Sequence, residues 1–80
     1  MKHDIYTKLG KFEVHLPYKP SPDDPILDKL KNTIDEFASN PPIDEDKLQS
    51  ALYDCTRAGD GAGVYVILSL KERRIEFSNM

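Results

Sequence analysis

The chain has 80 residues, of which 39% are hydrophobic and 31% charged, and it carries a net charge of -3. The length fits a single domain over residues 1–80, the composition is too apolar for a disordered chain, and the acidic balance argues against general binding to nucleic acid or anionic membranes. Cys55 is the only cysteine, so no disulfide can form within the chain. Without a signal peptide or an apolar run near the ~20 residues of a membrane helix, the sequence predicts a cytoplasmic protein.

The first part of the chain predicts a β-hairpin. Residues 4–9 and 12–17 alternate between apolar and polar side chains, and Gly10-Lys11 between them is typical of a two-residue turn that begins with glycine. This turn sets Leu9 opposite Phe12, so the apolar side chains of both strands share one face.

Two helices follow a proline-rich connection. Asp24 predicts the N-cap of the first helix and Pro25 its first residue, and the apolar stripe at helical spacing runs to Phe37. Asp44 predicts the N-cap of the second helix, which buries a stripe that includes Leu52 and stops at Gly59. Only about four residues join the helices, so we expect an antiparallel or sharply bent pair on one face of the sheet.

Residues 63–70 form the most apolar and most β-branched stretch of the chain. Both faces of this strand are largely apolar, which predicts a central strand. A polar turn centred on Glu72-Arg73 then returns the chain through a strand over 75–78, with Leu70 opposite Ile75. The predicted fold class is α+β: an antiparallel four-stranded sheet, β-β-α-α-β-β along the chain, with two helices on one face. The pattern leaves the strand order open.

No group of residues predicts catalysis, a cofactor or a metal site. The glycine run over 59–63 closes a helix and opens a strand, which is the reverse of a phosphate-binding loop. Cys55 falls on the apolar stripe of the second helix, where a free cysteine acts as a small hydrophobic side chain. His3 and His15 have opposite strand parity and therefore face different ways. We expect a protein that is not an enzyme and has no cofactor or metal.

Charge is distributed unevenly along the chain. Residues 21–60 contain 10 acidic and 4 basic side chains, a net charge of -6, while the other 4 acidic and 7 basic residues give +3. The helices are therefore expected to present an acidic surface to a basic partner protein, such as one that handles nucleic acid. The residues proposed for this acidic face are Asp28, Asp35, Glu45, Asp46 and Asp54.

The outer face of the sheet is the second candidate surface. Tyrosine and isoleucine beside cations are typical of protein interfaces, so this face predicts a homodimer contact or a second partner contact. Its proposed residues are Tyr6, His15, Tyr65, Ile67 and Arg74, with Lys8 opposite Glu13 and Tyr6 opposite His15.

These surfaces favour a non-enzymatic protein-binding module, a small inhibitor or accessory factor such as a phage or mobile-element protein. One alternative is a nucleic-acid-binding sheet, in which tyrosines stack on bases and cations contact phosphates. Those tyrosines are Tyr6 and Tyr65, and the cations are Lys8, Lys71, Arg73 and Arg74. Another alternative is a small dimeric ligand-binding regulator or enzyme with a pocket at its interface. The sequence leaves the partner, the oligomeric state and any small ligand open.

Overall fold

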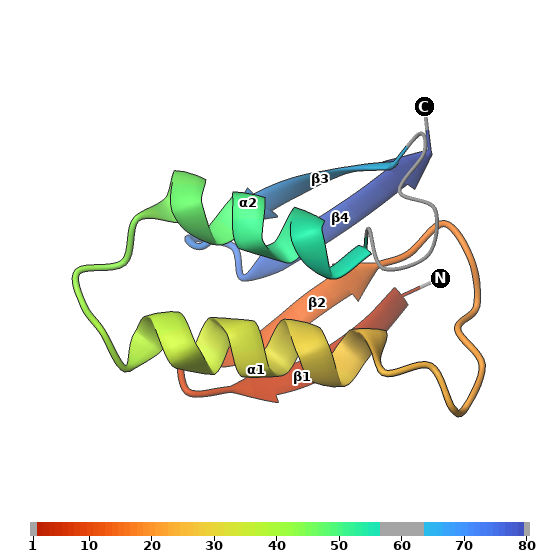
Figure 1. Ribbon diagram of the computed structural model, residues 1–80, viewed down its shortest axis with the longest axis horizontal. Coiled ribbons are helices and arrows are strands. Elements are labelled where there is room, and N and C mark those ends of the chain that lie inside the picture. The colour runs from red at the N-terminus through yellow and green to blue at the C-terminus, as the bar shows by residue number, and fades with distance from the viewer. Residues whose placement is uncertain (1, 57–63, 80) are drawn as a thin grey trace.

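A computed structural model describes residues 2–56 and 64–79 and shows an α+β protein with a four-stranded sheet and two helices. Both helices lie side by side on the same face of the sheet and run in opposite directions (Figure 1). Along the chain the elements are β1 (Lys2–Thr7), β2 (Gly10–His15), α1 (Ile26–Ala38), α2 (Glu45–Thr56), β3 (Val64–Ser69) and β4 (Arg74–Asn79).

The sheet is mixed, so the prediction of a purely antiparallel sheet is wrong. Its strand order is β1-β2-β4-β3, and β2 pairs with β4 in parallel through Val14 and Ile75. The two antiparallel helices return the chain to the end of the sheet where β2 finished (Figure 1). β3 therefore runs against β2, and β4, which turns back from β3, runs in the same direction as β2.

The stretch over 63–70 is not the central strand, because β3 lies at an edge of the sheet. Its two apolar faces suggested a sheet covered on both sides. The helices cover only one face, however, and the Ile67 side chain on the other face is 52% exposed. The central strands β2 and β4 alternate fully buried residues such as Val14 and Ile75 with charged residues on the outer face.

Both hairpins have a register other than the predicted one. In the first, Ile5 and not Leu9 lies opposite Phe12, because the turn falls at Lys8-Leu9 and Thr7 lies opposite Gly10. The Thr7 hydroxyl holds this turn, since its Oγ1 donates to the Gly10 carbonyl at 2.9 Å and accepts from the Leu9 amide at 3.1 Å. In the second hairpin, Leu68 and not Leu70 lies opposite Ile75. Each shift is an even number of residues, so the predicted inner and outer faces are unchanged.

The outer-face pairs that depended on the predicted register are also wrong. Tyr6 lies opposite Lys11 rather than His15. Lys8 is in the turn rather than opposite Glu13, and its side chain reaches α1 instead.

An aspartate lies just before each helix. Asp44 accepts hydrogen bonds from the Asp46 and Lys47 amides at 3.0 and 3.2 Å, which confirms it as the cap of α2. α1 begins at Ile26, one residue later than predicted, so its N-cap is Pro25 and not Asp24. The Asp24 carboxylate still accepts a hydrogen bond from the Ile26 amide at 3.0 Å. The predicted stop at Gly59 lies outside the described residues.

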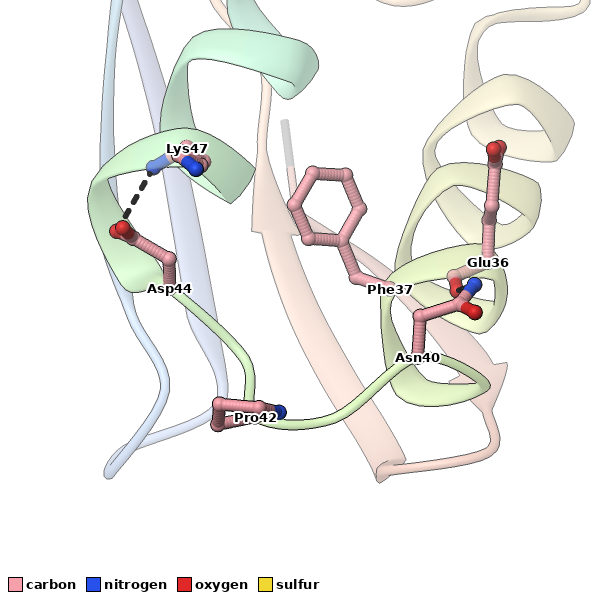
Figure 2. A pocket seen from close by; sticks show the side chains of 6 residues that line it. All are labelled: Glu36, Phe37, Asn40, Pro42, Asp44 and Lys47. Carbon is pink, nitrogen blue, oxygen red and sulfur yellow. Dashed lines mark hydrogen bonds between the residues drawn. The ribbon is translucent and has the colours of Figure 1, made fainter.

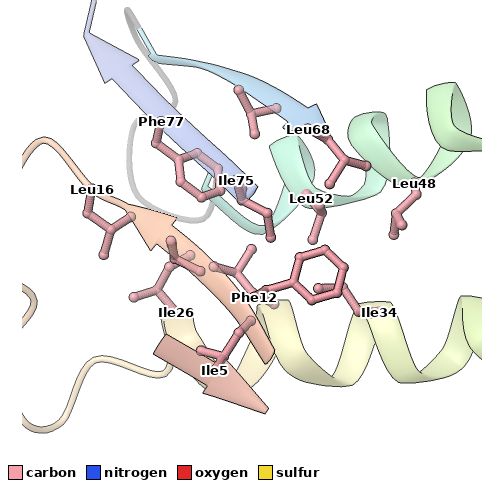
Figure 3. Packing of buried hydrophobic residues seen from close by; sticks show 13 residues of the cluster. Ile5, Phe12, Leu16, Ile26, Ile34, Leu48, Leu52, Leu68, Ile75 and Phe77 are labelled. Carbon is pink, nitrogen blue, oxygen red and sulfur yellow. The ribbon is translucent and has the colours of Figure 1, made fainter. Parts of the chain in front are cut away.

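The hydrophobic core lies between the helices and the inner face of the sheet (Figure 3). Among the described residues, thirteen apolar side chains that are at most 7% exposed form it. They are Ile5, Phe12, Val14, Leu16, Ile26, Leu30, Ile34, Leu48, Leu52, Val66, Leu68, Ile75 and Phe77. All six elements contribute, so the core fixes the helical layer against the sheet and leaves two surfaces, the helices and the outer sheet face, to contact other molecules.

Candidate functional site

Glu13 is the hub of an ionic network on the outer face of the sheet. Its carboxylate lies 2.9 Å from Lys2 Nζ on β1 and 2.9 Å from Nε2 of His15, two residues further along β2. Hydrogen bonds from His15 and Lys2, in that order of effect, lower the pKa of Glu13 from 4.5 to about 2. Glu13 therefore stays ionised well into the acidic range.

A second cluster on this face is centred on Arg74 of β4. Its guanidinium contacts Glu76 at 3.2 Å and Glu72 at 3.5 Å, and these carboxylates raise the pKa of Arg74. Asp4 of β1 lies 3.9 Å from Lys11 of β2. The predicted site residues His15 and Arg74 thus lie on the two central strands and are each bound to a neighbouring carboxylate.

The strand charges on the outer face cancel. Three cations, Lys2, Lys11 and Arg74, face three anions, Asp4, Glu13 and Glu76, within ion-pair networks of the same face. Of the other cations in the nucleic-acid alternative, Lys8 binds Ser39 at the end of α1, whereas Lys71 and Arg73 lie in the turn between β3 and β4. The face consequently offers little net positive field to a phosphate backbone.

The predicted aromatic and apolar residues of the outer face do not form one patch. Tyr6, which is 68% exposed, lies on β1, and Ile67 lies on β3 at the opposite edge of the sheet. Tyr65 lies opposite Ser78 of β4, and Ile67, two residues later on β3, lies opposite Glu76, so the two positions have the same strand parity. The ionic networks of the central strands therefore separate two edges that the sequence analysis treated as one surface.

Four of the five predicted acidic-face residues are exposed: Asp28, Glu45, Asp46 and Asp54. Within residues 2–56 and 64–79, no lysine, arginine or histidine forms an ion pair with any of these four carboxylates. Because the helices are antiparallel, Asp28 and Asp54 lie toward one end of the helical layer, and Glu45 and Asp46 lie toward the other (Figure 1).

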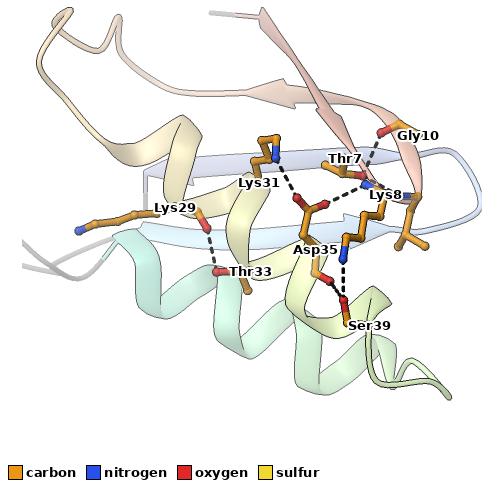
Figure 4. Close-up of polar contacts among 9 residues, drawn as sticks. Thr7, Lys8, Gly10, Lys29, Lys31, Thr33, Asp35 and Ser39 are labelled. Atoms are coloured by element: carbon orange, nitrogen blue, oxygen red, sulfur yellow. Dashed lines mark hydrogen bonds and ion pairs between the residues drawn. The ribbon is translucent and has the colours of Figure 1, made fainter.

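Asp35 has a different environment, because it joins α1 to the turn between β1 and β2 (Figure 4). Its carboxylate accepts from the Lys8 amide at 2.8 Å and pairs with Lys31 Nζ at 2.8 Å. These contacts, with Lys31 the stronger, lower the pKa of Asp35. Lys8 Nζ also donates to Ser39 Oγ at 2.9 Å. The Asp35 carboxylate is therefore already bound within the fold, so it is less available to a partner protein than the other four acidic side chains.

An open pocket of about 320 Å³ lies where the end of α1 meets the start of α2 (Figure 2). Its lining residues are Glu36, Phe37, Asn40, Pro42, Asp44 and Lys47. The Asp44 carboxylate is used by the Lys47 amide, and the Asn40 side chain donates to the Glu36 carbonyl at 3.1 Å. The Asn40 and Asp44 side chains in this pocket thus serve the end of one helix and the start of the next.

Cys55 lies between the helices, partly buried against the core. Its Sγ donates to the Ala51 carbonyl at 3.4 Å and lies 3.5 Å from Thr33 Oγ1. Among the described residues, no three His, Cys, Asp or Glu side chains come close enough together to hold a metal ion. In the same residues, no helix combines the length and apolarity needed to cross a membrane.

Comparison with known proteins identifies no relative. No protein-family model, curated protein or solved structure matches the chain.

Sequence reasoning missed several residues that shape these surfaces. Lys2, Asp4 and Lys11 are partners in the outer-face networks. Lys2 lies before the predicted first strand and Lys11 in the predicted turn, whereas strand parity within residues 4–9 already places Asp4 on this face. Gln49 of α2 accepts a hydrogen bond from the Leu68 amide of β3 at 3.1 Å. No local pattern signals that contact, because it joins residues far apart in the sequence.

Proposed function

We propose that the protein is a non-enzymatic protein-binding module, an inhibitor or accessory factor such as those of phages and mobile elements. It works in the cytoplasm and recognises a basic surface of another protein. One observation carries this proposal: Asp28, Glu45, Asp46 and Asp54 are exposed on the helices without ion pairs in the described chain, whereas the outer sheet face pairs its own charges.

The helical layer concentrates the negative charge of the molecule. Residues 21–56, which include both helices, contain 9 acidic and 3 basic side chains, a net charge of -6. Such a field raises the encounter rate with a positive surface and disfavours negative partners such as nucleic acid. A basic protein is therefore the partner class that fits this layer.

The outer sheet face supplies a second contact in this proposal. Ile67 is 52% exposed there, and an exposed aliphatic side chain beside paired charges suits the core and rim of a protein interface. Because the helices cover the opposite face of the sheet (Figure 1), this contact serves a second copy of the chain or a second partner, while the acidic layer steers the basic partner.

A triple neutralisation tests the acidic layer. Proteins captured by tagged wild type are identified and purified, and their dissociation constants are measured by calorimetry with Asp28→Asn/Asp46→Asn/Asp54→Asn. The matched control is Asp4→Asn/Glu72→Gln/Glu76→Gln, which removes the same charge from the sheet side. We expect the helical variant to weaken binding at least about tenfold, and the wild-type affinity to fall with added salt.

Two outcomes would contradict this function. Equal affinities for the helical variant and its control would mean that the acidic layer is not the contact surface. Tight binding of a single-stranded oligonucleotide at low salt, lost on Arg74→Gln, would instead favour the nucleic-acid alternative.

A further inference from the structure

The two edges of the sheet differ in how they are protected. Native edge strands normally carry charges or proline that prevent pairing with another strand. The β1 edge follows this rule, with Lys2 and Asp4 on the strand and the Lys31–Asp35 ion pair on the adjoining helix α1. β3 is the opposite edge, and Val64–Ser69 contains neither a charged residue nor proline. Its six residues have high β propensity, and the strand carries no charged side chain that would prevent pairing with another strand.

The hydrogen bond between the Leu68 amide and Gln49 shows which main-chain N–H and C=O groups of β3 are directed away from β4. In an antiparallel pair, alternate residues direct their N–H and C=O groups toward and away from the partner strand. The Leu68 amide donates to Gln49 Oε1 on α2, so Leu68, and Val66 two residues before it, direct these groups away from β4. The Gln49 amide oxygen occupies the position that a carbonyl of a neighbouring strand would take.

We propose that β3 pairs antiparallel with β3 of a second copy of this chain, which makes one continuous eight-stranded sheet from two four-stranded ones. A pairing centred on Val66 sets it opposite Val66 of the partner subunit and sets Tyr65 opposite the partner's Ile67. No like charges meet in this register, because Val64–Ser69 has none. The Leu68 amide exchanges Gln49 for a carbonyl of the partner strand.

The helix beside this edge also fits a second copy. Gln49 lies on the side of α2 that reaches the β3 edge, and Tyr53 follows one helical turn later on that side, partly buried against the core. Gln49 and Tyr53, in the middle of this side of α2, therefore add no charge to the interface. The acidic side chain Asp54 is exposed and stays available, so dimerisation would present two acidic layers on the same face of the joined sheet.

The solution mass and the exchange of one amide test this proposal. Light scattering coupled to size exclusion is measured over a wide concentration range for wild type, Ile67→Lys and Tyr6→Lys, with circular dichroism as the check of folding. Ile67 and Tyr6 are 52% and 68% exposed on opposite edge strands, so the two substitutions are matched. Hydrogen exchange of the Val66 amide is followed by NMR in dilute and concentrated wild type.

We expect a wild-type dimer whose dissociation constant rises at least about tenfold in Ile67→Lys and stays unchanged in Tyr6→Lys. The Val66 amide should exchange at least about tenfold more slowly in the dimer than in the dilute monomer. A wild-type monomer at every concentration would overturn the proposal. So would a dimer that Tyr6→Lys weakens as much as Ile67→Lys, or a dimer with a rapidly exchanging Val66 amide.

This inference does not depend on the acidic contact. Asp28→Asn/Asp46→Asn/Asp54→Asn should still form the dimer, since it changes no residue of β3 and leaves the Gln49 side chain intact. If this variant is a dimer that binds the outside partner as tightly as wild type, the result counts against the acidic contact alone. If wild type is a monomer whose partner binding still depends on these acidic residues, the result counts against strand pairing alone. The exchange rate of Val66 in wild type decides the result even if Ile67→Lys fails to fold.

Discussion

Gly10 has a backbone conformation that suits glycine better than any other residue. It follows the turn at Lys8-Leu9 with φ +111°, a conformation that residues with a Cβ rarely adopt. A Cβ at this position would also lie 2.6 Å from Nη1 of Arg73. The guanidinium is the end of a flexible side chain and can move, so the backbone conformation is the larger obstacle to substitution.

Gly10→Ala should therefore lower the free energy of unfolding by about 1–3 kcal/mol. Urea titration followed by circular dichroism measures the loss. The double variant Gly10→Ala/Arg73→Ala is the control, because removing the guanidinium relieves crowding and leaves the backbone strain. Full recovery in the double variant would show that crowding, and not φ, makes glycine necessary.

Glu13 should make stability depend on acid. Its pKa of about 2 in the folded protein lies below the ordinary value of 4.5, because His15 and Lys2 bind the carboxylate. The stabilisation from this residue is complete above pH 4.5 and is lost as the pH falls through about 2. Comparing urea midpoints across this range, we expect Glu13→Gln to lose less stability toward low pH than wild type does.

The matched variant Glu45→Gln removes a carboxylate that has no ion pair within the described residues. It should retain the acid dependence of wild type. Parallel curves for wild type and Glu13→Gln would show that the Glu13 contacts do not persist in solution.

Each helix of this fold depends on a side chain that lies just before it. Asp44 binds two amides at the start of α2 with its carboxylate, while the Asp46 carboxylate in the first turn accepts from no amide within the part of the chain that the structure describes. Asp44→Ala should cost about 1 kcal/mol, roughly 4–8 °C in Tm. Asp46→Ala removes the same charge from the same helix end, so thermal denaturation should show a smaller loss. Equal losses would attribute the effect to charge rather than to the cap.

The strand and helix patterns were readable from the sequence because they are local. Alternation in residues such as Phe12 and Val14 gave the inner face of β2, and Asp44 gave the start of α2. The hairpin registers were not readable, because the glycine rule selected Gly10-Lys11 as the turn. The Thr7 hydroxyl and Asp35, a residue of α1, instead bind the turn at Lys8-Leu9.

At the scale of the whole molecule, the strand order and the chemistry of the surfaces depend on contacts that no local pattern encodes. The apolar run of β3 has the composition of a central strand, yet pairing of β2 with β4 leaves it at the edge. The candidate acidic face was foreseen from composition, but the role of Asp35 in fastening a turn required the position of Lys8. The local alternation of apolar and polar residues predicts which face of a strand is buried. Tertiary contacts determine which strands are neighbours and which residues form hydrogen bonds and ion pairs.

The parallel pairing of β2 with β4 also bears on the order of folding. Each hairpin and the helix pair join segments that are close in sequence, whereas Val14 and Ile75, neighbours in this seam, are about sixty residues apart along the chain. Closing so long a loop costs conformational entropy before the core can compensate for it. The hairpins are therefore expected to form early, and the seam between β2 and β4 is expected to be the late step that sets the folding rate and makes the two halves one cooperative unit.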